Sequence, residues 1–301
     1  MERLWYQMYR ARGVGTKSLH RIFEAVQSGA LDINSISDLP FAELQNKTGL
    51  SSAACLELSE IGKDSHFNTE FEELKSKGCE VLHLQHQEYP ALVYQRLKNE
   101  SPPIIFCLGD TALLNTPSVT IAGSRSASER SVALAKEISR RLAKAGKNIV
   151  AGYARGVDNA AHLGALEAGG STTIVLSLGI HHFEKKGDFN RLNEGGRFLA
   201  ISQFHPYEVW RGRNAMARSR LSVALSQAVV IVECGPRIDP DNEKLSGTFH
   251  TGETALELGI PLFVISPEEV PATAVGNAEL IKMGGVEVTG EEVLERIISI
   301  C

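Results

Sequence analysis

The sequence predicts an α/β protein in which a doubly wound parallel sheet follows a small all-helical domain. Three observations lead to this prediction. From residue 118 onward, short apolar strands alternate with amphipathic helices, a pattern typical of a parallel sheet covered by helices on both faces. Glycine turns follow the first two of these strands, as in folds that bind ligands at the carboxyl ends of their strands. Residues 1–63 show helical periodicity alone, broken at glycines.

The 301 residues divide into three predicted parts. Residues 1–63 form the helical domain, residues 64–117 a mixed connecting segment, and residues 118–301 the sheet domain. The elements expected before residue 118 are helices near 3–11, 16–28, 38–47, 51–62 and 68–77 and strands at 80–84 and 104–108. The elements expected in the sheet domain are strands at 118–122, 148–151, 171–178, 198–202, 228–233 and 261–265 and helices at 129–145, 157–168, 214–224, 252–258 and 291–300.

Charge is distributed unevenly along the chain. The net charge is −5, but residues 120–220 carry 16 basic and 8 acidic side chains, a local charge of +8. A local basic surface is what binding of a polyanion requires, although solvated helix surfaces account for part of the excess. The overall negative charge therefore does not exclude a nucleic-acid-binding protein.

Composition excludes several classes of protein. With 43% hydrophobic and 22% charged residues, the chain is globular rather than disordered. We find no apolar stretch long enough to cross a bilayer and no signal-peptide pattern. The five cysteines are odd in number and contain no C-x-x-C pair, and the histidines lack metal-ligand spacing. We therefore expect a cytoplasmic protein with no membrane contact, metal or cofactor.

The first two glycine turns of the sheet domain are suited to binding an anion. Each follows a strand and precedes a helix, where glycine lets the backbone approach a ligand and the first-turn amides attract negative charge. The first turn, at residues 123–126, contains Arg125, and the second, at 152–156, contains Arg155; both arginines offer paired donors for phosphate. Neither turn has the G-x-G-x-x-G pattern, so a dinucleotide cofactor is not expected. Each glycine could also serve its turn alone.

An arginine-rich segment and a third turn complete the candidate site. Four arginines occur within residues 211–220, more than the start of a solvated helix explains. Together with the turns, they predict a groove for a phosphate backbone. Residues 246–253 form a small-residue turn before a helix, suited to phosphate or to close packing. The predicted DNA- or phosphate-binding residues are Gly123, Ser124, Arg125, Ser126, Gly152, Arg155, Gly156, Arg211, Arg213, Arg218, Arg220, Ser246, Gly247 and Thr248.

Other polar residues near these turns are expected to be structural. Asp158 is placed to cap its helix, and His162, one helical turn later, fits a structural role better than a catalytic one. His250 has no nucleophile paired with it in the sequence. No H-E-x-x-H, G-x-S-x-G or Walker A motif occurs, and we expect no catalytic residue.

Taken in order, these motifs resemble the DprA/Smf (DNA-processing protein A) family, over about two thirds of the chain. Residues 152–162 are similar to the family's S-G-x-A-x-G-I-D-x-x-A-H, and residues 218–233 to its R-N-R-I-I-x-x-L-S-D-x-x-V-V-V-E. Residues 246–248 stand at its S-G-[ST/A]. The helical residues 1–63 are similar to the helix-hairpin-helix-like or SAM-like region that precedes the Rossmann domain in many members.

The resemblance implies an extended Rossmann fold that binds single-stranded DNA and forms a homodimer. It implies protection of incoming or exposed single strands, transfer to RecA in recombination or natural transformation, and no turnover reaction. Three departures indicate a divergent member: Ser219 replaces the Asn of R-N-R, residues 203–206 replace E-x-P-x-G, and residues 237–244 form an acidic insert. We also expect no C-terminal winged-helix domain.

Two alternatives remain open at this point. Nucleoside-monophosphate phosphoribohydrolases of the lysine-decarboxylase-like (LOG) type carry P-G-G-x-G-T-x-x-E. Here Thr251 stands at the glutamate position and Glu253 comes two residues later. This mismatch favours a binding protein over an enzyme, because a displaced carboxylate rarely keeps catalytic geometry. A nucleotide-sensing module would hold a mononucleotide in the same pocket.

Overall fold

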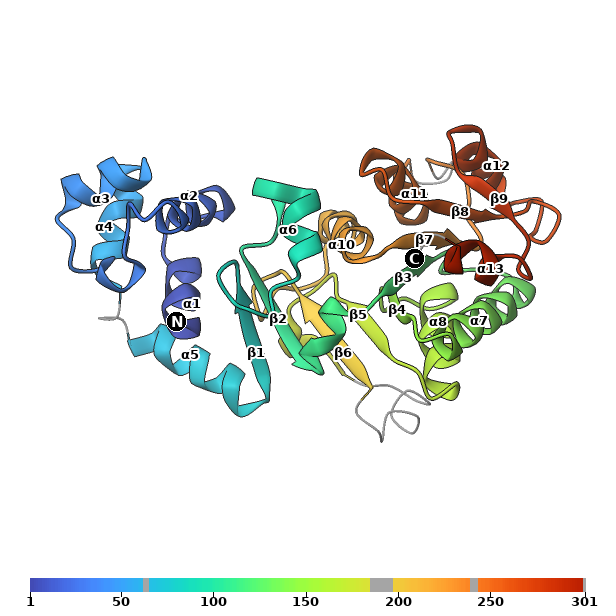
Figure 1. Cartoon of the computed structure of the whole chain (residues 1–301), viewed down its shortest axis with the longest axis horizontal. Helices are drawn as coiled ribbons and strands as arrows, with labels where there is room; N and C mark the ends of the chain where they lie inside the picture. The colour runs from blue at the N-terminus through green and yellow to red at the C-terminus, as the bar shows by residue number, and fades with distance from the viewer. Residues whose placement is uncertain (62–64, 185–196, 239–242, 300–301) are drawn as a thin grey trace. The chain divides into compact units, whose positions relative to one another are not determined.

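The computed structural model describes residues 1–61, 65–184, 197–238 and 243–299, which belong to two compact units, Met1–Cys107 and Leu108–Cys301 (Figure 1). The predicted domain boundary after residue 63, the end of the helix predicted at 291–300 and the middle of the acidic insert lie outside the described residues. The three-part division of the chain stays a prediction. No helix in the described part is long and apolar enough to span a membrane.

The first unit is mainly helical. Its elements are α1 (Glu2–Arg10), α2 (Thr16–Gln27), α3 (Phe41–Thr48), α4 (Ser52–Ser59), α5 (Ser65–Ser76), β1 (Cys79–His83), α6 (Ala91–Leu97) and the first four residues of β2 (Ile104–Gly109). The strands β1 and β2 are neighbours in the sheet. The sequence pattern does not predict α6, because seven residues are too few to show helical periodicity.

Aromatic side chains of α1 form the core of the first unit. Trp5 and Tyr6 are both fully buried. The Trp5 ring lies parallel to the ring of His83 at the end of β1, with 5.1 Å between centroids, and the Tyr6 ring meets Phe106 of β2 edge-on at 6.2 Å. Helix α1 and the two strands therefore pack together, which is why the unit extends beyond the predicted helical domain.

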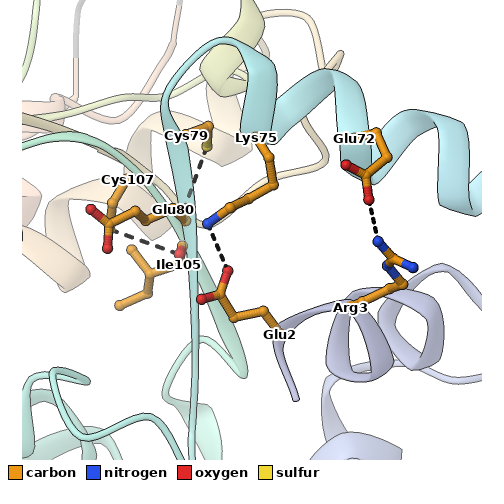
Figure 2. Close-up of polar contacts among 8 residues, drawn as sticks. All are labelled: Glu2, Arg3, Glu72, Lys75, Cys79, Glu80, Ile105 and Cys107. Atoms are coloured by element: carbon orange, nitrogen blue, oxygen red, sulfur yellow. Dashed lines mark hydrogen bonds and ion pairs between the residues drawn. The ribbon is translucent and has the colours of Figure 1, made fainter.

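Ion pairs link α1 to α5 at the surface of the same unit (Figure 2). The Nζ atom of Lys75 lies 2.9 Å from Oε2 of Glu2, and Arg3 pairs with Glu72. All four side chains are partly or largely exposed, so these pairs add little stability. The buried aromatic core provides the larger contribution.

The second unit is built on seven parallel strands in the order β6-β5-β4-β3-β7-β8-β9. They are β3 (Ser118–Ala122), β4 (Asn148–Ala151), β5 (Thr172–Val175), β6 (Phe198–Ser202), β7 (Ala228–Ile231), β8 (Leu262–Ile265) and β9 (Val286–Val288). The strands β3, β4 and β6 have their predicted bounds, and β5, β7 and β8 are shorter than predicted. The pattern does not predict β9, whose first two residues are exposed.

Helices cover both faces of this sheet (Figure 1). One layer contains α7 (Glu129–Lys144), α8 (Val157–Glu167) and α13 (Val293–Ile298), and the other contains α10 (Gly212–Leu225), α11 (Gly247–Glu257) and α12 (Val275–Lys282). Along β7, Val230 packs in the core of the first layer, whereas Val229 and Ile231 pack in that of the second. The predicted doubly wound α/β fold is confirmed.

The direction of winding reverses at β3. From β3 the chain adds β4, β5 and β6 on one side, and then returns to place β7 against the other side of β3. Ala122 at the end of β3 lies beside Ile231 at the end of β7. The loops that follow these two strands diverge onto opposite faces, so a crevice is expected at this edge of the sheet.

Candidate nucleic-acid interface

A cavity of about 1050 Å³ lies at this point of reversal. Its walls are the turn after β3, the start of α8, the first half of α10, the loop after β7 and the start of α11. The charged residues among the described lining are Arg125, Arg213, Arg218, Lys244, Asp158 and Glu233. Cationic side chains thus outnumber carboxylates, so the cavity favours an anionic ligand.

Arg218 is the buried cation of the cavity. Its side chain is 14% exposed, and Nη2 lies 3.8 Å from Oδ2 of Asp158, whose side chain is 7% exposed. The guanidinium lies directly against Gly152, because a Cβ added there would come within 2.4 Å of three of its atoms. The Nε atom is buried without a hydrogen-bond acceptor among the described residues. Arg218 thus lines the cavity while most of its side chain is buried.

Asp158 does not cap α8, contrary to the prediction. The helix begins at Val157 and its N-cap is Gly156, so Asp158 is the second helical residue. Its carboxylate accepts a hydrogen bond from the backbone N–H of Ala154, at 3.4 Å, and faces Arg218. Burial raises the pKa of the Asp158 carboxyl, and the guanidinium of Arg218 opposes that rise. Asp158 serves as the counter-ion of Arg218.

The start of α7 is already occupied by a carboxylate. Oε2 of Glu233, just after β7, accepts hydrogen bonds from both the backbone N–H and the hydroxyl of Ser128, each at 3.0 Å. The Ser128 hydroxyl also caps the helix by accepting from the N–H of Ser131. At this helix start the amides of Ser128 and Ser131 are therefore already occupied, and Arg125 is the cation that this turn offers.

The start of α11 offers amides to the cavity instead. The helix begins at Gly247, five residues earlier than predicted, because the Ser246 side chain caps it by accepting from the N–H of Phe249. The amides of Gly247 and Thr248 have no acceptor within their helix. A Cβ added at Gly247 would meet nothing within 4 Å, so a ligand can approach this backbone closely.

Two of the predicted binding glycines hold the first two turns together. A Cβ at Gly123 would lie 2.4 Å from Cγ2 of Val157, and one at Gly156 would lie 2.4 Å from the carbonyl oxygen of Ser124. Gly156 also has φ of +79°, a conformation that side chains rarely adopt. Both glycines are needed for packing, whatever their contact with a ligand.

The structure brings nine of the fourteen predicted site residues into the lining of the cavity, namely Gly123, Ser124, Arg125, Ser126, Arg213, Arg218, Ser246, Gly247 and Thr248. The other five lie outside it. Gly152 and Gly156 pack as described, and Arg155 is exposed. Arg211 pairs with Glu208 at 2.9 Å, and Arg220 with Glu257 at 3.4 Å. A role for these five in binding stays a prediction.

Trp210 and Lys244 are two lining residues that the sequence analysis did not predict as binding residues. Trp210 is 52% exposed, and the guanidinium carbon of Arg125 lies 5.7 Å from the centroid of its ring. Lys244 belongs to the segment that the sequence presents as an acidic insert. An aromatic residue directly before an arginine cluster is a recognisable signal for nucleic-acid binding, and could have identified Trp210.

His162 lies beneath the site as a buried structural residue. Its Nε2 atom is 2.5 Å from the carbonyl oxygen of Gly152, and its Nδ1 atom is 2.7 Å from the hydroxyl of Thr172. Because a carbonyl oxygen can only accept, Nε2 carries the proton. Burial lowers the pKa of His162 to about 4, so the ring is neutral at pH 7.

Glu253, the carboxylate nearest to the position where a phosphoribohydrolase has its glutamate, forms an ion pair outside the cavity. Glu253 pairs with Arg237, with 2.9 Å between Oε1 and Nη2, and does not line the cavity. Thr251 does line it, but its hydroxyl donates to the carbonyl oxygen of Gly247 within its own helix. Among the described residues, no group of three or more His, Cys, Asp or Glu side chains could hold a metal ion.

Comparison with known proteins agrees with this architecture. The family model of DNA recombination-mediator protein A matches residues 80–298. DNA processing protein DprA of Streptococcus pneumoniae is 31% identical over 198 residues, which cover 65% of this chain and 67% of that protein. Protein Smf of Escherichia coli is 30% identical over 202 residues, covering 65% of this chain and 51% of that one.

Two solved structures have the same fold. DNA processing protein A of Streptococcus pneumoniae superposes with a TM-score of 0.77 at 24% identity, over 98% of this chain and 97% of that one. The Helicobacter pylori protein, whose structure concerns its mode of single-stranded DNA binding, has a TM-score of 0.59 at 25% identity, over 73% of this chain and 96% of its own. With most of the chain matched by the family model, the protein belongs to the DprA/Smf family of DNA recombination-mediator proteins.

Proposed function

We propose that this protein binds single-stranded DNA through its phosphate backbone, in the cavity between α10 and α11. The observation that carries the proposal is the cationic lining of that cavity, where Arg125, Arg213, Arg218 and Lys244 face two carboxylates that already have partners. A volume of about 1050 Å³ is at the upper end for a small-molecule site, which suits a run of nucleotides better than one. Family membership supports the same function.

The parts of the cavity have different tasks in this proposal. Arg125 and Arg213 are exposed and meet successive phosphates as charged donors. Arg218 is fixed by Asp158 and contributes its positive charge to the wall of the cavity. The amides of Gly247 and Thr248 bind a further phosphate at the start of α11. None of these groups activates water, so the proposal is for a binding protein rather than an enzyme.

A salt titration tests the proposal. Binding of labelled oligo-dT and of a duplex of equal length is measured by anisotropy between 50 and 300 mM salt. Three or more phosphate contacts give a log–log slope of about −2 or steeper for the single strand. Tighter binding of the single strand with such a slope supports the proposal. A slope near zero, or equal binding of both DNAs, contradicts it.

We further propose that this cytoplasmic protein protects exposed single strands during recombination and transformation, and that it passes them to RecA as a homodimer. Support comes from the family, which is that of a recombination mediator. Light scattering after size exclusion tests the dimer. RecA filament formation on an oligonucleotide, with and without the protein, tests the transfer; no acceleration would contradict it.

A further inference from the structure

Trp210 stands at the rim of the cavity, in the segment between β6 and α10. Its side chain is 52% exposed and lines the cavity beside Arg125, Arg213 and Gly212. The protein's other tryptophan, Trp5, is fully buried in the first unit. An indole left half in water beside a cationic cavity is unusual, because transfer of such a ring from water into the protein interior is favourable.

The contact with Arg125 leaves ring surface available. The guanidinium carbon lies 5.7 Å from the ring centroid, a cation–π distance. One guanidinium covers at most one face of an indole, and half of the Trp210 surface stays exposed. The contact also fixes the ring next to a cation that is itself placed for a phosphate. An aromatic face beside a phosphate-binding arginine is the arrangement that single-stranded nucleic acids use, with the base on the ring and the backbone on the charge.

Neighbouring aromatic residues do not share this placement. Tyr207 is 41% exposed, but its ring contacts those of His181, at 4.3 Å, and His205, at 6.0 Å, and it does not line the cavity. Among the described aromatic side chains, Trp210 is therefore the one at the cavity. It comes four residues after the segment 203–206, where this chain departs from the family pattern.

We propose that Trp210 is a stacking platform for one nucleobase of the bound strand. The inference rests on the proposed function and adds to it a means of selecting single-stranded over double-stranded DNA. Single and double strands both offer phosphates, whereas stacking on Trp210 requires a base that is free of its partner. Trp210 is thus the residue that makes the cavity prefer unpaired DNA.

The experiment compares oligo-dT with an abasic oligonucleotide of the same length, which has the phosphates but no bases. Wild type, Trp210→Leu, Trp210→Phe and the matched control Tyr207→Leu are titrated by anisotropy, and the emission of wild type is compared with that of Trp210→Phe, in which Trp5 alone emits. We expect Trp210→Leu to bind oligo-dT about 5- to 150-fold more weakly than wild type does. Trp210→Phe should bind about as tightly as wild type, because it keeps an aromatic ring. Tyr207→Leu should bind as wild type does. All four should bind the abasic strand equally and melt at similar temperatures. Oligo-dT should quench the Trp210 emission, and the abasic strand should not.

The outcomes separate this inference from the proposed function. If wild type binds neither oligonucleotide, the proposed function fails and the stacking fails with it. If wild type binds both equally and Trp210→Leu changes neither, phosphate binding stands and the stacking platform is overturned. If dTMP quenches the emission as strongly as oligo-dT does at equal nucleotide concentration, the ring serves a mononucleotide, which also overturns the proposal.

Discussion

Arg218 and Asp158 form an ion pair with 3.8 Å between Nη2 and Oδ2, in a place where both side chains are at least 86% buried. The pair joins the first half of α10 to the start of α8, and so joins two walls of the cavity. Burial lowers the pKa of the Arg218 guanidinium and raises that of the Asp158 carboxyl, while each group opposes the shift of the other. Each charge therefore depends on its partner.

Arg218→Ala should destabilise the fold by about 3 kcal/mol at pH 8, because it leaves a buried carboxylate without its counter-ion. The pKa of Asp158 is already raised and rises further in the variant, so protonation relieves the cost as the pH falls. Urea unfolding at pH 8 and pH 5 should show a smaller loss at pH 5. Arg213→Ala, at an exposed position in the same cavity, is the control and should unfold as wild type does. Equal stability of both variants would contradict the prediction.

Arg125→Ala should weaken DNA binding without weakening the fold. Loss of one charge-assisted phosphate contact corresponds to about 1–3 kcal/mol, and to a salt slope shallower by about 0.7. The side chain is exposed, so the unfolding free energy should change by less than about 0.5 kcal/mol. Arg140→Ala removes an equal charge from α7, where Arg140 pairs with Glu137. If it lowers affinity as much as Arg125→Ala does, net charge rather than position governs binding.

Gly156→Ala and Gly247→Ala should have opposite effects. The Cβ at Gly156 meets the Ser124 carbonyl oxygen at 2.4 Å and φ is +79°, so we expect a loss of at least about 1 kcal/mol in stability. The Cβ at Gly247 meets no protein atom within 4 Å but stands where a phosphate would approach α11. Gly247→Ala should keep wild-type stability and lose DNA affinity. Thermal melting and anisotropy on both variants measure this; a stability loss confined to Gly247→Ala would refute it.

Stability should fall as the pH drops below about 6.5. Burial lowers the pKa of His162 from 6.5 to about 4, so the folded state binds this proton less readily than the unfolded chain does. The neutral ring therefore stabilises the folded state fully above the pKa of the unfolded chain, 6.5, and this stabilisation is lost as the pH falls towards 4. Between pH 7 and pH 5 the loss from this group is about 2 kcal/mol. Unfolding of His162→Gln over the same range gives the comparison: a slope as steep as that of wild type would mean that other groups cause the loss.

Purified protein should not release a base from nucleoside monophosphates. The nearest counterpart of the hydrolase glutamate, Glu253, is bound to Arg237 and lies outside the cavity lining. Chromatography of reactions with each monophosphate measures release, and Glu253→Gln controls for a contaminating hydrolase. Multiple turnovers that disappear in Glu253→Gln would place the protein among the enzymes.

The strands and turns of the sheet domain could be predicted because their signals are local. Apolar runs such as Ser118–Ala122 and Phe198–Ser202 are bounded by turn residues only a few positions away in the sequence. The start of α11 was not predicted, since its cap Ser246 acts on one amide three residues away and leaves little periodicity to detect. The short edge strand Val286–Val288 gave no pattern at all.

The chemistry of the site depends on contacts between residues far apart in the sequence. Glu233 contacts Ser128, which is 105 positions away in the sequence. Arg218 contacts Asp158, which lies at the start of a different helix. No spacing in the sequence reveals such pairs, so the sequence predicted the same phosphate-binding role for Arg125 and Arg218. Their burial makes them different: one is a surface donor, and the other is part of the protein's internal framework.

The cavity is assembled from two stretches of chain, one running through β3 and α8 and the other through α10, β7 and α11. A ligand that contacts both walls and binds only the folded protein stabilises the fold by an amount that grows with the free ligand concentration. The occupied protein is then harder to unfold than the empty one. A higher concentration of ligand should therefore slow the degradation of this protein by proteases, which cleave unfolded chains.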